Sequence, residues 1–198
     1  MNRCAHSWCL LLALGLIVTA CQTGSMTGSG RPNAGPGAQH VRENCYALLY
    51  SLLSDEKNLD KLLVIKMETT ELRQLVKAIA TSSADGVRRM EAYAAADPSI
   101  HLKDERLPPG EMATRAAIAK TKTKLLVKPF DKNFEFNLLL TQTEALSYAW
   151  HLARVAAAHE NNPDRARGLT SFSETMQTLH NRTVSLLRVR ADQSSPPK

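Results

Sequence analysis

The feature that most constrains this chain is an apolar repeat with helical spacing. Between residues 70 and 96, apolar and small side chains recur in alternating steps of four and three, at Leu72, Val76, Ile79, Ser83, Gly86, Met90 and Tyr93. Such spacing places one side chain per turn on the same face of an α-helix. A step that averages about 3.5 residues also predicts helices that pack side by side at small crossing angles.

Four further segments carry the same spacing. Together with residues 70–96, the segments predicted to be helical are 39–67, 111–127, 132–160 and 163–190. Pro98 and Pro163 mark two of the breaks, because proline disfavours helix in the residue before it. Thr70 and Asn162 are expected to cap the helices that they precede. The run Ser54-Asp55-Glu56 can also cap a new start, so the first segment fits either one kinked helix or two short ones.

Composition agrees with a helical protein. Of the 198 residues, 22% are charged and 5% are aromatic, and good helix formers such as alanine and leucine are abundant. We therefore predict an all-α fold, an antiparallel up-down four-helix bundle. The lean helix at 111–127 is expected to be a shorter member or the fourth wall. Its predicted inner face consists of Met112, Ala116, Ala119, Thr123 and Leu126.

We expect a secretion signal in the first 21 residues. An apolar run from Cys9 to Val18 follows Arg3. The run is too short for a membrane-spanning helix, which needs about twenty residues, but it suits the apolar part of a signal peptide. It ends in Val18-Thr19-Ala20-Cys21, which resembles the lipobox of bacterial lipoproteins. This resemblance implies removal of residues 1–20, a diacylglycerol on the Cys21 sulfur and acylation of the new amino terminus. The alternative is an ordinary signal peptide with an incidental cysteine.

The segment from Cys21 to residue 38 predicts a flexible tether. It is rich in Gly, Ser, Thr and Pro and has no apolar period, which is typical of flexible linkers. The bundle is then expected at 39–192, and a disordered tail at 193–198. Two or three acyl chains hold a protein on a membrane durably, so we expect a lipid-anchored protein of the cell envelope. The residue after Cys21 is Gln22 and not an aspartate. In this position the chain resembles Gram-negative lipoproteins that are sorted to the outer membrane, facing the periplasm.

Three short motifs fall at characteristic places in the helical part. They are Leu107-Pro108, Phe130-Asp131 before a long helix, and His180 in the last helix. In these motifs the chain resembles a family of uncharacterised periplasmic proteins with a ferritin-like four-helix bundle. The resemblance implies a fold rather than an activity. The chain differs from the family at residues 88–91, where the family has Asp-His, and at residues 141–144, where it has another histidine.

Candidate metal ligands are few. A di-iron site in a helical bundle uses Glu-x-x-His motifs, and the sequence contains none. The remaining candidates are Glu91, Glu144, His151 and His180. Two of them, Glu144 and His151, lie two turns apart, about 10 Å along a helix, which is too far for both to reach one ion easily. We therefore predict no metal, and expect these histidines to be satisfied by neighbouring groups.

Motifs for catalysis are also absent from the sequence. It has no Cys-x-x-Cys-His for covalent haem, although a non-covalent axial pair such as Met90 or Met176 with His180 stays open. Neither a nucleophile elbow nor a Gly-rich phosphate loop follows a strand pattern. Cys45 would be the last thiol left in the mature domain, and its apolar surroundings predict a small buried side chain. We predict no enzyme and no cofactor beyond the lipid on Cys21.

The net charge of +6 bears on possible partners. Lysines gather at residues 120–128, and arginines near the end of the last helix. Such residues form a solvated face or a contact with an anionic surface such as lipid head groups. Nucleic acid is not expected, because base-stacking aromatic residues are few. The leading hypothesis is a non-enzymatic interaction or structural module on an envelope lipoprotein; the alternative is a ferritin-like metal-binding bundle in metal or oxidative-stress handling.

Overall fold

The computed structural model describes residues 36–64, 69–103, 107–127 and 133–193. Every regular element within these ranges is helical, which confirms the all-α prediction. The predicted signal peptide, the tether up to residue 35 and the tail from residue 194 lie outside the described residues. None of the described helices combines the length and apolarity needed to cross a membrane.

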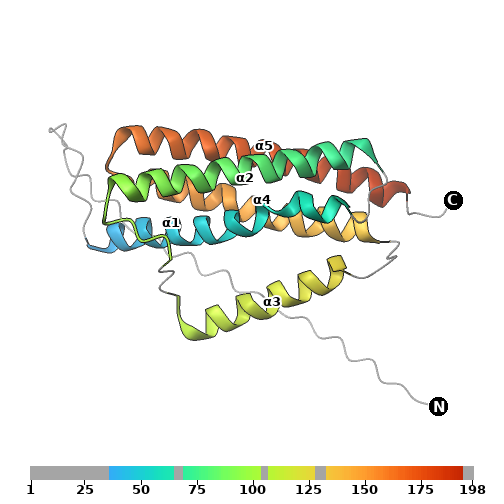
Figure 1. Ribbon diagram of the computed structural model, residues 1–198, viewed down its shortest axis with the longest axis horizontal. Helices are drawn as coiled ribbons and strands as arrows, with labels where there is room; N and C mark the ends of the chain where they lie inside the picture. Colours follow the sequence, from blue (N-terminus) through green and yellow to red (C-terminus); the bar gives the residue numbers. More distant parts are fainter. Residues whose placement is uncertain (1–35, 65–68, 104–106, 128–132, 194–198) are drawn as a thin grey trace, which may run out of the picture. The chain divides into compact units, whose positions relative to one another are not determined.

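Five α-helices and one 3-10 helix make up the described part of the chain (Figure 1). In chain order they are α1 (Pro36–Glu56), η1 (Leu59–Val64), α2 (Thr70–Ala96), α3 (Pro109–Val127), α4 (Phe134–Ala158) and α5 (Pro163–Gln193). The first predicted segment is therefore split into α1 and η1. α1 also begins inside the predicted tether, at Pro36, because proline is well tolerated in the first turn of a helix.

Helix ends follow local hydrogen-bonding groups. Asn162 caps α5 as predicted, since its Oδ1 accepts bonds from two backbone amides in the first turn, at 2.9 and 3.1 Å. The residue before α2 is Thr69, so the prediction of Thr70 as the cap was wrong. The side chain of Thr69 makes no capping bond. It instead accepts a hydrogen bond from Arg190 on α5, at 3.1 Å.

Four of the helices surround an apolar core. α4 and α5 make the most extensive contact, α1 packs against α2 and α4, and α2 packs against α5, as Figure 1 shows. The largest fully enclosed apolar side chains are Tyr46, Leu49, Leu53, Leu75, Ile79, Met90, Leu138, Leu139, Leu146, Leu169 and Met176. Each buried side chain of this size stabilises the fold by about 1.5–3 kcal/mol, so the apolar stripes hold these helices together.

α2 lies close to two neighbouring helices at Gly86. A Cβ added at this position would lie 2.6 Å from Leu53 Cδ1 on α1 and 2.7 Å from Phe172 Cζ on α5. Contacts this short force neighbouring atoms to move. Packing between helices therefore selects glycine here.

α3 packs against α4, and most of the predicted inner face of α3 is not part of this contact. Met112, expected inward, is 52% exposed. Polar side chains make the contact instead: Arg115 Nη2 donates to Tyr148 Oη at 2.6 Å, and Lys122 forms an ion pair with Glu144. The prediction of a lean apolar inner face was wrong for Met112, Ala116, Ala119 and Thr123, which are exposed. Leu126 packs against the core as predicted.

Candidate functional site

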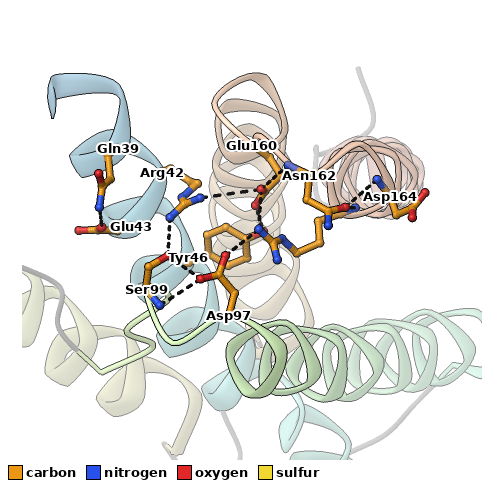
Figure 2. Close-up of polar contacts among 10 residues, drawn as sticks. Gln39, Arg42, Glu43, Tyr46, Asp97, Ser99, Glu160, Asn162 and Asp164 are labelled. Atoms are coloured by element: carbon orange, nitrogen blue, oxygen red, sulfur yellow. Dashed lines mark hydrogen bonds and ion pairs between the residues drawn. The ribbon is translucent and has the colours of Figure 1, made fainter. Parts of the chain in front are cut away.

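Glu160 places a carboxylate inside the protein, in the short connection between α4 and α5. Its side chain has no exposed area. A buried carboxylate is unfavourable unless hydrogen-bond donors and opposite charges surround it. The groups around Glu160 come from α1, from the connection itself and from the start of α5 (Figure 2).

Both carboxylate oxygens of Glu160 have donors. Tyr46 Oη on α1 donates to Oε2 at 2.7 Å. Oε1 accepts from Arg165 Nη2 and from the backbone amide of Asn162, each at 2.9 Å. Arg42 Nη1 lies 3.9 Å from the same oxygen. Two guanidinium groups thus offset the charge of Glu160.

The same contacts extend to the residues that follow α2. Arg165 Nη2 lies 2.7 Å from Asp97 Oδ2, and Asp97 Oδ1 accepts from Ser99 Oγ, also at 2.7 Å. Ser99 Oγ in turn accepts from Arg42 Nη2 at 2.8 Å. We call this set the end network; its members are Arg42, Tyr46, Asp97, Ser99, Glu160, Asn162 and Arg165. It joins α1, the segment after α2, the α4–α5 connection and α5.

The end network keeps its carboxylates ionised. Burial raises the pKa of Glu160, but hydrogen bonds from Arg165 and two other donors outweigh burial, so the pKa is lower than usual. A hydrogen bond from Ser99 lowers the pKa of Asp97. Burial and the bond to Glu160 raise the pKa of Tyr46. Since these groups keep their protonation states near neutral pH, the arrangement is suited to joining helices and not to general acid–base catalysis.

Arg190 also joins helices, at a site separate from the end network. Arg190 near the end of α5 lies 2.8 Å from Glu135 Oε2 in the first turn of α4. The same guanidinium donates to Thr69, the residue before α2. The start of α2, the start of α4 and the end of α5 are therefore linked through one side chain.

Glu56, the last residue of α1, has a different environment. Its Oε2 is buried without a hydrogen-bond partner among the described residues, and the same holds for Oε1 of Gln142 on α4. Burial raises the pKa of Glu56 to about 7, and Asp55 adds to this effect, whereas the Gln142 amide and Lys122 on α3 counter it. Glu56 therefore changes protonation near neutral pH.

Each of the four candidate metal ligands contacts another side chain. Glu91 on α2 accepts a hydrogen bond from Tyr50 at 3.0 Å, and Glu144 is paired with Lys122. His151 stacks on Trp150, with ring centroids 4.4 Å apart, and the His180 ring is 5.9 Å from the same indole. The two histidines thus share one aromatic neighbour. Within the described ranges, no group of three or more His, Cys, Asp or Glu side chains could hold a metal ion.

Sequence reasoning missed the end network, although α1 carries a sign of it. In the sequence of α1, apolar residues at helical spacing begin at Val41 and continue through Cys45 and Leu48. Val41 is nevertheless 38% exposed, whereas the neighbouring Arg42 is 6% exposed. Arg42, Tyr46, Leu49 and Leu53 follow the same helical spacing one residue later. An arginine at the head of an apolar stripe is a reason to search for a buried partner.

Cys45 behaves as predicted from its apolar surroundings. It is buried, and burial raises the pKa of its thiol to about 11. A thiol needs its thiolate form to react as a nucleophile. Cys45 is therefore a packing residue.

The predicted lipidation motif, residues 18–21, lies outside the described residues. The contacts above therefore concern the helical part of the chain only. No protein-family model matches the chain, and neither a curated protein nor a solved structure matches it.

Proposed function

We propose that the chain is an envelope lipoprotein, held on a membrane by lipid at Cys21, whose helices act as a non-enzymatic interaction or structural module. The observation that carries the proposal is the run Val18-Thr19-Ala20-Cys21 at the end of an apolar segment. The polar residues that follow it suit a spacer between lipid and protein. The outer membrane, facing the periplasm, is the proposed location because of Gln22.

We also propose that α1, α2, α4 and α5 form an antiparallel, ferritin-like up-down bundle. Two observations support this arrangement. The contacts close a ring, since α1 meets α2, α2 meets α5, α5 meets α4 and α4 meets α1. The connection between α4 and α5 is short, which favours antiparallel neighbours.

Exposed apolar side chains support a role in binding another protein. Of the eight large apolar side chains exposed among the described residues, five belong to α3 and the first turns of α4. These five are Met112, Ile118, Leu125, Phe136 and Leu140. Single exposed apolar residues are common, but a concentration in one part of a chain is typical of a binding surface. We propose that this helix pair contacts an envelope protein, with the lysines of α3 available to an anionic surface.

The metal-binding alternative would need its candidate residues to converge on one ion. Glu91 is engaged by Tyr50, and Glu144 is engaged by Lys122 on another helix. We find no contact that favours this alternative over the interaction module.

The lipid anchor is tested with Cys21→Ala. Wild-type protein should incorporate labelled palmitate and sediment with membranes, whereas the variant should lose the label and leave the membrane fraction. Cys45→Ala is the matched control, because it removes a buried thiol and leaves the motif intact. Continued labelling of Cys21→Ala would show that the anchor assignment is wrong.

The binding surface is tested by photo-crosslinking in living cells. A photoreactive amino acid at Ile118 or Leu140 should capture a specific envelope protein. The same amino acid at Glu174, an exposed position on α5, should not. Capture of no protein from either apolar position, with the variants present at normal levels, would overturn the interaction role.

A further inference from the structure

Two exposed apolar side chains of α3 lie on one side of its contact with α4. That contact is made by Arg115 and Lys122, which are seven residues apart and therefore share a face of α3. Ile118 and Leu125 are also seven residues apart and share a second face. Counting about +100° per residue, this second face is rotated by roughly −60° from the side that meets α4. Ile118 is 48% exposed and Leu125 is 40% exposed.

Phe136 and Leu140 form a similar face on α4. They are four residues apart, which makes them neighbours on one side of the helix. The residues of α4 that contact α3 are Tyr148 and Glu144. By the same count, Phe136 and Leu140 are rotated by roughly −60° to −100° from that contact. Their side chains are 39% and 43% exposed.

The two apolar faces adjoin each other. The contacts pass from Arg115 to Lys122 along α3 and from Tyr148 back to Glu144 along α4, so the two helices run in opposite directions. In antiparallel helices, rotations of the same sign away from the contact lead to the same side of the pair. The two helices therefore present one apolar surface, which we call the α3–α4 face. Its members are Ile118, Leu125, Phe136 and Leu140.

Two positive charges flank the α3–α4 face. Lys124 directly precedes Leu125, and Arg154 shares the rotational position of Phe136 about five turns further along α4. Both basic side chains are exposed, and neither belongs to an ion pair among the described residues. The acidic residues of α3 and α4 are each paired with another basic side chain; they are Glu111, Glu135 and Glu144. The charge beside the face is therefore positive and unbalanced.

The α3–α4 face suits a helical partner. Every regular element in the described ranges is helical, so this part of the chain offers no sheet edge to which a partner strand could add. A third helix can pack along two others through apolar residues at positions i, i+3 or i+4, and i+7. Ile118 and Leu125 span two turns, about 10 Å, which matches that spacing.

Charge decides which helix fits. In a two-fold pair the same face would meet itself, so a second copy of this chain would bring only positive unpaired charges together. Carboxylates on a partner complement Lys124 and Arg154 instead. We propose that the α3–α4 face binds an amphipathic helix of another protein, with an apolar stripe on the face and Asp or Glu residues beside Lys124 and Arg154. The inference rests on the proposed interaction role and names the kind of partner.

Photo-crosslinking of the full chain from Leu140 tests the inference, with the captured partner segment identified by mass spectrometry. The segment should combine apolar residues at helical spacing with Asp or Glu residues. Lys124→Glu with Arg154→Glu should reduce capture by about tenfold, because attraction at two ion pairs becomes repulsion. Lys124→Arg with Arg154→Lys keeps both charges and should preserve capture. Arg182→Glu with Arg188→Glu makes the same change of charge at exposed positions of α5 and should also preserve it.

The outcomes separate this inference from the interaction role on which it rests. Capture that the charge reversal leaves unchanged would overturn the acidic helix and leave the interaction role standing. Crosslinks to a second copy of this chain, to lipid, or to a segment without acidic residues would overturn it as well. No capture from the otherwise unaltered protein would overturn the interaction role itself. Added salt in isolated envelopes should weaken capture by the wild-type chain, and salt-independent capture would also contradict the acidic partner.

Discussion

The hydroxyl of Tyr46 donates a 2.7 Å hydrogen bond to the buried carboxylate of Glu160, 114 residues later in the chain. This contact joins the third turn of α1 to the connection between α4 and α5. Because the acceptor is a charged group out of contact with water, the bond is of the stronger kind. Its contribution can be measured, since phenylalanine removes the donor and little else.

Tyr46→Phe should therefore destabilise the protein by about 1.5–3 kcal/mol. The Glu160 carboxylate would lose its donor to Oε2 and would remain buried. Urea unfolding followed by circular dichroism measures the change. Tyr50→Phe is the control, because the Tyr50 hydroxyl bonds to Glu91 at an exposed site. A change below about 0.5 kcal/mol is expected there, and equal effects of the two variants would contradict the special status of Tyr46.

Arg165→Met should cost about 3–5 kcal/mol, because it removes the partner of a buried carboxylate. Arg165 contacts both Asp97 and Glu160. Arg167 offers a matched control two residues later, since it pairs with Asp164 at the surface, where such pairs contribute about 0–1 kcal/mol. Thermal unfolding of Arg165→Met and Arg167→Met should thus give clearly different midpoints. Similar midpoints would show that the end network is not a main source of stability.

Gly86→Ala should destabilise the fold by about 1–3 kcal/mol, the usual cost of overpacking. The new methyl group would meet Leu53 and Phe172 at distances under 3 Å. Gly110→Ala is the control, because a Cβ there meets nothing within 4 Å and alanine favours a helix. We expect the second variant to be neutral or slightly stabilising in chemical denaturation. A neutral Gly86→Ala would mean that α1 and α5 can move away from α2 at little cost.

Global stability should also depend on pH through Glu56. The folded protein holds the pKa of Glu56 near 7, above its value of 4.5 in the unfolded chain. The stability from this group is therefore complete below about pH 4.5 and is lost as pH rises to about 7, by at most about 3 kcal/mol. Unfolding free energies of wild type and Glu56→Gln, measured between pH 4.5 and 8, should converge at low pH and separate at high pH. A constant difference would contradict the assignment.

Acid should act through different residues. The pKa of Glu160 and that of Asp97 are lowered in the folded protein. Their contribution is present above their unfolded pKa values and is lost as pH falls through the folded ones. Glu160→Gln should therefore reduce stability at neutral pH and flatten the loss below about pH 4. Wild-type stability that is unchanged from pH 5 to pH 2 would contradict this account.

Helices could be predicted from the sequence because their signals are local. Apolar spacing and residues such as Asn162 lie within a few positions of the elements that they define. The side of α3 that faces α4 could not be predicted from such local signals. Arg115 and Lys122 are ordinary surface residues until Tyr148 and Glu144 are brought beside them.

The end network escaped sequence reasoning for the same reason. Arg42 is buried because Glu160 is nearby in space, and no short-range pattern links the two residues. The contact between the His180 ring on α5 and Trp150 on α4 also depends on the packing of these two helices. The sequence predicted that these histidines are satisfied by neighbouring groups, but it could not identify Trp150 as the neighbour of His180.

The end network also determines how the protein would respond to mechanical load. α1 begins at Pro36, and Arg42 and Tyr46 in its first turns are bonded to Ser99 and Glu160. A pulling force applied to the chain ahead of α1 would therefore reach these polar bonds before it reached the apolar stripe. Several bonds would have to break together before α1 could peel away. If the protein is attached through its N-terminal side, the hydrogen bonds and ion pairs of the end network lie close to the point of attachment.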